Sequence, residues 1–89
     1  MVDNDNIIAL ASPSGIGAIS LIRISGPESI QIVDNVFRGI EKLSLNNQQS
    51  SKVQLGYIYD KQNTIDKVLV TVFRNPKSYT GEDLVEISC

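Results

Sequence analysis

Two charged residues stand inside apolar stretches that have the character of β-strands. Arg23 lies among Ile and Leu in residues 18–25, and Glu86 lies among Leu, Val and Ile in residues 84–88. A charge in such surroundings is costly unless it is paired or hydrogen-bonded. A carboxylate accepts two parallel hydrogen bonds from a ring with adjacent N–H groups, and a guanidinium donates a planar fork to an anion or a carbonyl.

These two residues therefore allow two interpretations. In the functional one, Arg23 and Glu86 hold a partly buried polar ligand whose two ends have opposite charge requirements. In the structural one, both side chains point to solvent at a sheet edge, or they pair with each other. The sequence alone leaves both interpretations open.

Catalytic chemistry finds no support in the residue types. The chain has no His and a single Cys, Cys89, which excludes a Ser-His-Asp set, a Cys-His pair and a zinc cluster. Gly15-Ile16-Gly17 has the start of a dinucleotide-binding pattern, but Ser20 replaces its third Gly, and an Ile-rich strand follows instead of a helix. The Gly-Lys-Ser/Thr sequence of a phosphate-binding loop is absent from the chain. We expect no catalytic residue, no metal site and no nucleotide hydrolysis within these residues.

Composition indicates one ordinary globular domain. The chain has 89 residues, of which 42% are hydrophobic and 20% are charged. Its net charge of -2 argues against a general nucleic-acid-binding surface. No apolar run approaches the roughly 18–20 residues that span a bilayer, and the first residues lack the positive charge of a signal peptide. We expect a cytoplasmic protein without membrane contact.

The hydrophobic pattern predicts the element order β-β-α-β-β-β, which is an α+β fold with a mixed β-sheet and one helix. Strands are expected at residues 7–11, 18–25, 53–59, 68–73 and 84–88. Alternation in the third of these strands predicts that Val53, Leu55, Tyr57 and Tyr59 share its buried face.

The single helix is expected to open after Gly26-Pro27. Ser25 and Glu28 have the spacing of a capping box, and Gly39 is a suitable stop. The apolar stripe that supports this helix consists of Ile30, Val33, Val36, Phe37 and Ile40.

The last strand, residues 84–88, is followed only by Cys89. Chain termini are usually polar and frayed, so a buried strand in this place predicts a domain truncated at its C-terminal side. The alternative is a domain that simply ends in a strand.

Two parts of the chain together resemble one protein family. The first part runs from Asn4 to Ile19 and continues through Leu21–Gly26 with the sequence Leu-Ile-Arg-Ile-Ser-Gly. The second runs from Pro76 to Asp83, includes Thr-Gly-Glu-Asp, and continues through Val85–Cys89. In this combination and order they resemble the N-terminal domain of the tRNA-modification GTPases called MnmE or TrmE. The match covers about half of the chain.

Departures from the family pattern are small. Asn6 and Ser12 stand where the family usually has Thr, and Ser20 stands where it favours Gly or Ala. The family continues after the position of Cys89 with His-Gly-Gly, a helix, a further strand, and a helical domain that carries an inserted G domain.

The resemblance implies a fold similar to tetrahydrofolate-binding domains, with residues 1–89 as a truncated N-terminal folate-binding and dimerisation domain. It implies a site for 5-formyltetrahydrofolate, which carries a one-carbon unit for the wobble uridine of tRNA. Arg23 and Glu86 match positions that contact folate in the family, and Glu86 would accept from the amino and ring N–H groups of the pterin. A third family ligand, a Lys, would lie beyond Cys89.

For the full-length protein, the resemblance implies a GTP-hydrolysing enzyme that adds a carboxymethylaminomethyl group at C5 of that uridine. GTP, Mg²⁺ and K⁺ would bind in the G domain, which this chain does not include. The partners implied are a second copy through the present domain, the flavin-dependent protein MnmG (GidA), and tRNA. The alternative function is a structural dimerisation module that binds no ligand of its own.

Overall fold

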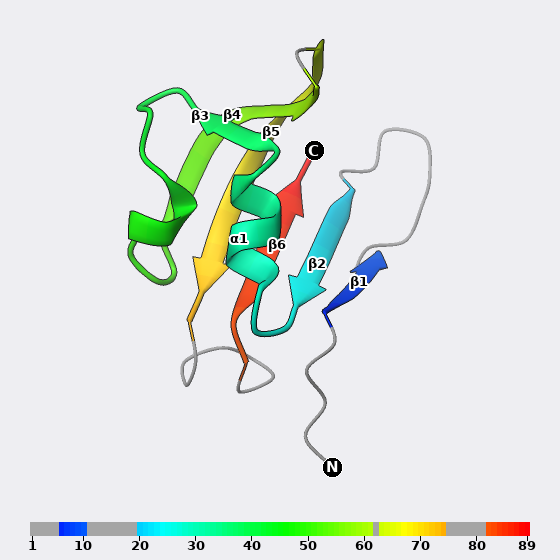
Figure 1. The fold of residues 1–89 in the computed structure, drawn as a ribbon, viewed down its shortest axis with the longest axis vertical. Helices are drawn as coiled ribbons and strands as arrows, with labels where there is room; N and C mark the ends of the chain where they lie inside the picture. Colours follow the sequence, from blue (N-terminus) through cyan, green and yellow to red (C-terminus); the bar gives the residue numbers. More distant parts are fainter. Residues whose placement is uncertain (1–5, 11–19, 62, 75–81) are drawn as a thin grey trace.

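The computed structural model describes residues 6–10, 20–61, 63–74 and 82–89. Within these residues, six strands form one sheet with the order β1-β2-β6-β5-β4-β3, and a short helix packs on it (Figure 1). The strands are β1 (Ile7–Leu10), β2 (Leu21–Ser25), β3 (Phe37–Gly39), β4 (Val53–Asp60), β5 (Asn63–Phe73) and β6 (Leu84–Ser88). The helix α1 spans Ser29–Asp34, and a 3-10 turn, η1, spans Leu45–Asn47.

The α+β class is confirmed, but the sheet is antiparallel where the sequence analysis expected a mixed one. All five strand pairs are antiparallel. A parallel pair needs a crossover connection between neighbouring strands. Helix α1 joins β2 to β3, and these two strands are separated by three others in the sheet. The helix therefore creates no parallel neighbours.

The expected strands are present with shifted ends. β6 has the predicted bounds, whereas β5 begins at Asn63, five residues before the predicted start. The hairpin between β4 and β5 is consequently tight, and Lys61 in its turn has a φ of 59°. The Gly15–Gly17 loop, most of the turn before β6, and the predicted strand residues 11, 18 and 19 lie outside the described residues.

The predicted C-terminal half of the helix is wrong. α1 ends at Asp34, and Phe37–Gly39 forms β3 instead. β3 pairs with β4, with Phe37 opposite Ile58 and Gly39 opposite Gly56. Aromatic and β-branched residues fit a pleated surface well, and the unpaired edge of β4 offers them hydrogen bonds. Phe37 reaches the core from this strand.

The predicted capping box is also wrong, because Ser25 is the last residue of β2 and Glu28 precedes the helix without a side-chain cap. The backbone N–H of Glu28 instead donates to Oδ1 of Asn6, at 3.0 Å. Gly26 has a φ of 139°, and a Cβ at this position would overlap Asn6. The glycine thus lets the chain before β1 support the helix start.

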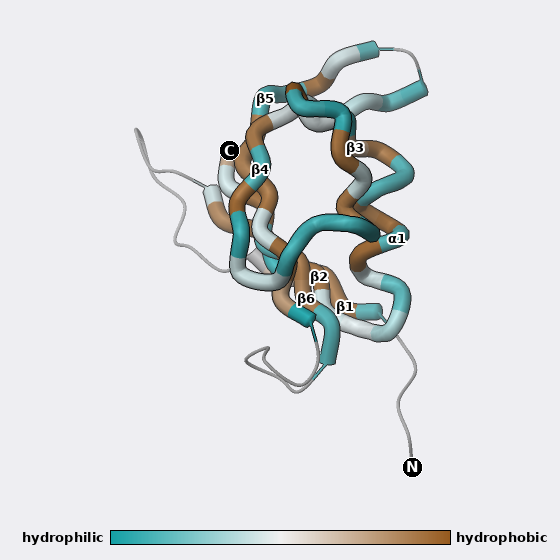
Figure 2. Tube along the Cα trace, turned by 90° about the vertical axis from the view of Figure 1, so that its left-hand side faces the viewer, coloured by the Kyte–Doolittle hydropathy of each residue, from teal (hydrophilic) through white to brown (hydrophobic). Residues whose placement is uncertain are grey.

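The sheet has one covered and one open face. α1 lies on the side that we call the helix face, as the side view in Figure 2 shows, and Leu45 of η1 belongs to the same core cluster as the buried residues of α1. The buried core residues gather there: Ile24, Ile30, Val33, Phe37, Leu45, Val68, Val70, Val72, Val85 and Ile87. We call the opposite side the open face.

The predicted buried face of β4 is wrong, although its alternation is confirmed. Gln54 and Gly56 point to the helix face and are buried, while Val53 and Leu55 are 59% and 38% exposed on the open face. Pairing with β5 explains this orientation, because Gln54 and Gly56 stand opposite the core residues Val70 and Val68. Nε2 of Gln54 donates to Oε1 of Gln48 at 2.8 Å, whereas Oε1 of Gln54 is buried without a hydrogen-bond partner among the described residues.

Gly56→Ala is expected to destabilise the protein by about 1–3 kcal/mol, the range for overpacking a filled core. The new Cβ would lie 2.5 Å from Cζ of Phe37 and would also meet the backbone oxygen of Arg38. Urea unfolding measures the loss. Val53→Ala, at an exposed position on the same strand, is the control and should cost less than about 0.5 kcal/mol. Equal losses in the two variants would contradict this account of β4.

Candidate functional site

Arg23 and Glu86 lie directly opposite each other on β2 and β6. Nε of Arg23 donates to Oε2 of Glu86 at 2.8 Å, across 63 residues of sequence. Both strands have neighbours on each side in the sheet. The structural interpretation had two forms. The prediction that the two residues pair with each other is confirmed, and the prediction that they lie at a sheet edge is wrong. The pairing does not decide whether the two residues also bind a ligand.

The two side chains differ in accessibility. That of Arg23 is 43% exposed and that of Glu86 is 13% exposed. An ionised carboxylate offers about four acceptor positions on its two oxygens. Oε1 of Glu86 receives no hydrogen bond from the residues that the structure describes. The carboxylate therefore retains acceptor capacity toward the open face, in a place largely removed from water.

The surroundings of Glu86 form a polar row across an apolar surface. Thr71 of β5 stands opposite Glu86 on the side away from Arg23, so Arg23, Glu86 and Thr71 follow one another across three strands. Along β6, Leu84 shares the face, and Leu69 lies diagonally on β5. Such a surface suits a flat molecule with N–H donors at one edge and apolar ring faces. It contains no nucleophile–base pair.

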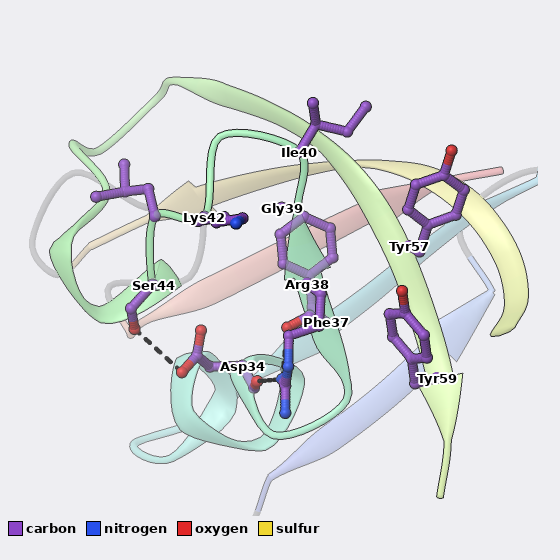
Figure 3. Close-up of a pocket in the computed structure, with 10 residues that line it drawn as sticks. Asp34, Phe37, Arg38, Gly39, Ile40, Lys42, Ser44, Tyr57 and Tyr59 are labelled. Carbon is purple, nitrogen blue, oxygen red and sulfur yellow. Dashed lines mark hydrogen bonds between the residues drawn. The ribbon is translucent and has the colours of Figure 1, made fainter. Parts of the chain in front are cut away.

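A different pocket, of about 610 Å³, lies beside the edge strand β3. Figure 3 shows Tyr57 and Tyr59 next to each other on β4, with Lys42 and Ser44 on the loop across from them. Sequence reasoning missed this pocket, since it assigned β3 to the helix. Lys42 has a φ of 61°, a left-handed backbone conformation that the sequence did not predict.

Two charged residues of this pocket, Asp34 and Arg38, form hydrogen bonds within the fold. The carboxylate of Asp34 accepts from Oγ of Ser44 at 3.1 Å and from the backbone N–H of Leu45 at 2.8 Å. Arg38 donates to the carbonyl oxygen of Phe37 at 2.9 Å. The bonds of Asp34 tie the end of α1 to η1, and a second bond from Arg38, to the carbonyl oxygen of Asp34 at 3.4 Å, ties it to β3.

The described part of the chain holds no group of three or more His, Cys, Asp or Glu residues that could bind a metal ion. Its helices are too short to cross a membrane.

The antiparallel sheet with one covered face and an ion pair on the other defines a small α+β domain. Comparison with known sequences gives its family: the chain belongs to the family described as GTP-binding protein TrmE N-terminus, whose model matches residues 6–89. The family predicted from the sequence is confirmed.

Curated relatives carry the name tRNA modification GTPase MnmE. The protein of Flavobacterium johnsoniae is 52% identical over 100% of this chain and 19% of its own length. That of Christiangramia forsetii is 52% identical over 97% of this chain and 18% of its own length. That of Bacillus subtilis is 38% identical over 96% and 19%. The chain thus spans about a fifth of the relatives it matches.

A double-mutant cycle on Arg23→Gln and Glu86→Gln is expected to give a coupling energy of about 1 kcal/mol in urea unfolding. The reason is the short, partly buried contact between Nε and Oε2. Lys67→Gln combined with Glu86→Gln is the control. Lys67 is exposed and lies two residues before Leu69 on β5, and it is not paired with Glu86. Additive effects of the Arg23 and Glu86 substitutions would show that their contact contributes nothing to stability.

Proposed function

We propose that the chain is the first part of the N-terminal domain of a longer tRNA-modification GTPase, and that this domain binds 5-formyltetrahydrofolate. Family membership and the names of the curated relatives support the first part of the proposal. The single observation that carries the second is the Arg23–Glu86 pair, whose Glu86 keeps an acceptor oxygen toward the open face.

The residues of the polar row fit the chemistry of a reduced folate. Its pterin ring has an amino group beside a ring N–H, and a carboxylate accepts from such a pair. Glu86 would supply this acceptor, and Arg23 would hold the carboxylate in place through the bond from its Nε. The apolar side chains around the row, including Leu69, would lie against the ring. The bound folate supplies the one-carbon unit, and the chain itself binds and orients.

In this proposal the complete protein modifies C5 of the wobble uridine of tRNA with a carboxymethylaminomethyl group. GTP hydrolysis with Mg²⁺ and K⁺ would take place in a G domain further along the chain. The protein would act in the cytoplasm as a homodimer joined through the present domain, together with MnmG. The name of the curated relatives, tRNA modification GTPase, supports the overall activity.

A second candidate function is dimerisation without a ligand. It is favoured by the exposed apolar side chains of the open face, Val53, Leu55 and Leu69. It is also compatible with the ion pair, since Arg23 and Glu86 then satisfy each other. Sedimentation of the full-length protein with and without folate separates the two candidates. A stable dimer that shows no calorimetric response to folate would favour the structural role.

Glu86→Gln in the full-length protein is expected to weaken binding of 5-formyltetrahydrofolate at least about tenfold. A hydrogen bond to a charged group contributes about 1.5–3 kcal/mol, and 1.4 kcal/mol corresponds to a factor of ten in Kd. Isothermal titration calorimetry measures the change. Lys67→Gln, on the same face but away from the row, should leave Kd unchanged. Unaltered binding after both Glu86→Gln and Arg23→Gln would remove these residues from the site.

A further inference from the structure

The end of β4 that pairs with β3 carries an aromatic side chain between two cations. In the sheet register, Tyr57 of β4 stands opposite Arg38 of β3 on one side and opposite Lys67 of β5 on the other. Residues directly opposite each other in an antiparallel sheet point to the same face, with Cβ atoms about 4.5–5.5 Å apart. Arg38, Tyr57 and Lys67 therefore form a row across three strands, which we call the tyrosine row. Alternation along β4 places it on the same face as Leu55, the open face.

A second tyrosine and a third cation lie beside this row. Tyr59 follows Tyr57 at the period of a strand, and Figure 3 shows the two rings next to each other, with Lys42 on the loop across from them. The register between β4 and β5 shifts at Tyr59, and such irregularities redirect side chains. Arg38, Lys42 and both tyrosines line the pocket of about 610 Å³ beside β3.

The polar groups of these side chains retain binding capacity. Both tyrosines are half-buried, and their hydroxyls form no hydrogen bond with the residues that the structure describes. Lys42 and Lys67 are exposed, and neither forms an ion pair within the same described ranges. Arg38 uses one guanidinium nitrogen, Nη1, for its bonds to main-chain oxygens. A guanidinium has five N–H donors, so Arg38 has further donors to offer.

The nearby carboxylates are turned away from these cations. That of Asp34 accepts hydrogen bonds from Ser44, Leu45 and Asn46, on the side of η1. Asp66 lines an apolar groove between α1 and the strands β1, β2 and β6, on the helix face. The tyrosine row and its pocket thus have a local positive excess in a chain whose net charge is -2. That net charge argues against a broad basic surface, but a site for a few nucleotides needs only local cations.

We propose that the tyrosine row and the adjoining pocket bind single-stranded RNA, with bases stacked on Tyr57 and Tyr59 and phosphates against the three cations. Every nucleobase has an aromatic face that stacks on a tyrosine ring, and sheets that present aromatic side chains among basic ones bind single strands in this way. A pocket of about 610 Å³ lies within the range of small-ligand sites, about 300–1,000 Å³. The inference rests on the proposed function in one respect, that the substrate of the complete protein is an RNA.

The spacing of the cations favours a strand over a free nucleotide. Arg38 and Lys67 stand two strand spacings apart, roughly 10 Å, with the tyrosine between them. Such a separation suits phosphates on successive nucleotides better than the adjoining phosphates of one molecule. The tyrosine row also shares the open face with the polar row. Lys67 and Thr71 are four residues apart on β5, about 13 Å, so an RNA strand here would lie near the proposed folate site.

Fluorescence anisotropy of a fluorescein-labelled single-stranded RNA with the full-length protein tests the stacking. Tyr57→Leu and Tyr59→Leu keep the apolar bulk but remove the aromatic ring, and each should weaken binding at least about fivefold, as expected for a lost stacked base. Tyr57→Phe retains the ring and should bind the RNA like the unchanged protein. Circular dichroism verifies that each variant is folded. Unchanged Kd in both Leu variants, or equal weakening in Tyr57→Leu and Tyr57→Phe, would overturn the proposal.

The salt dependence of the same binding tests the cations. Lys42→Gln and Lys67→Gln should each reduce the slope of log Kd against log salt concentration by about 0.7, the value for one phosphate contact with a single strand. Lys52→Gln is the matched control, because Lys52 is exposed and precedes the opposite end of β4. Slopes that are the same in all three variants would show that the two lysines contact no phosphate, which contradicts the proposed site.

Photocrosslinking places the RNA on the chain. RNA that contains 4-thiouridine should crosslink to the tryptic peptide 53–61, which lies between Lys52 and Lys61 and holds both tyrosines. Absence of this crosslink, or its displacement by uridine monophosphate at the Kd of the RNA, would reject the strand as the occupant. Calorimetry with folate separates the two proposals. RNA binding at the tyrosine row without a response to folate would support this inference and reject the proposed ligand, whereas the converse result would reject this inference alone.

Discussion

The register between β2 and β6 is the constraint on which the other features of this domain depend. It joins residues 63 positions apart and sets Arg23 opposite Glu86 and Ile24 opposite Val85. A slip of one residue would move every side chain of a strand to the other face. Arg23 would then enter the core, and Ile24 would leave it. The apolar core and the charged row therefore specify the same pairing, one from each face.

Arg74 and Arg23 have different roles in the domain. Arg74 donates to the carbonyl oxygens of Leu45, Asn46 and Gln48, and thereby fixes the turn η1 against the end of β5. Its partners are backbone atoms that any sequence would offer. Arg23 instead faces a carboxylate across a central pair of strands. A charge pair in that position is a weak source of stability, because desolvation offsets much of the attraction. This difference makes the Arg23–Glu86 pair the better candidate for recognition.

Local patterns predicted most strands and the two charged residues, but they could not assign the faces of β4. Val53 and Leu55 are apolar and Gln54 is polar, so periodicity favoured the wrong side. The true orientation depends on contacts outside the strand: Gln54 bonds to Gln48, and Gly56 leaves room for the ring of Phe37. The predicted end of α1 was wrong for the same reason. Phe37 has the spacing of a helical apolar stripe, but it lies in β3, which pairs with β4.

The pairing of Arg23 with Glu86 was only one of the alternatives open to sequence reasoning, because strand register over 63 residues leaves no local signal. The structure adds that the domain has apolar surface on both faces and that the two surfaces differ. The open face carries a charge row among exposed Val53, Leu55 and Leu69, whereas the groove on the helix face has Asp66 as its charged lining residue. A polar planar ligand is compatible with the first and would be poorly solvated in the second. The two surfaces therefore differ in chemistry, and a planar polar ligand of the proposed kind is better satisfied by the charged row of the open face than by the apolar groove.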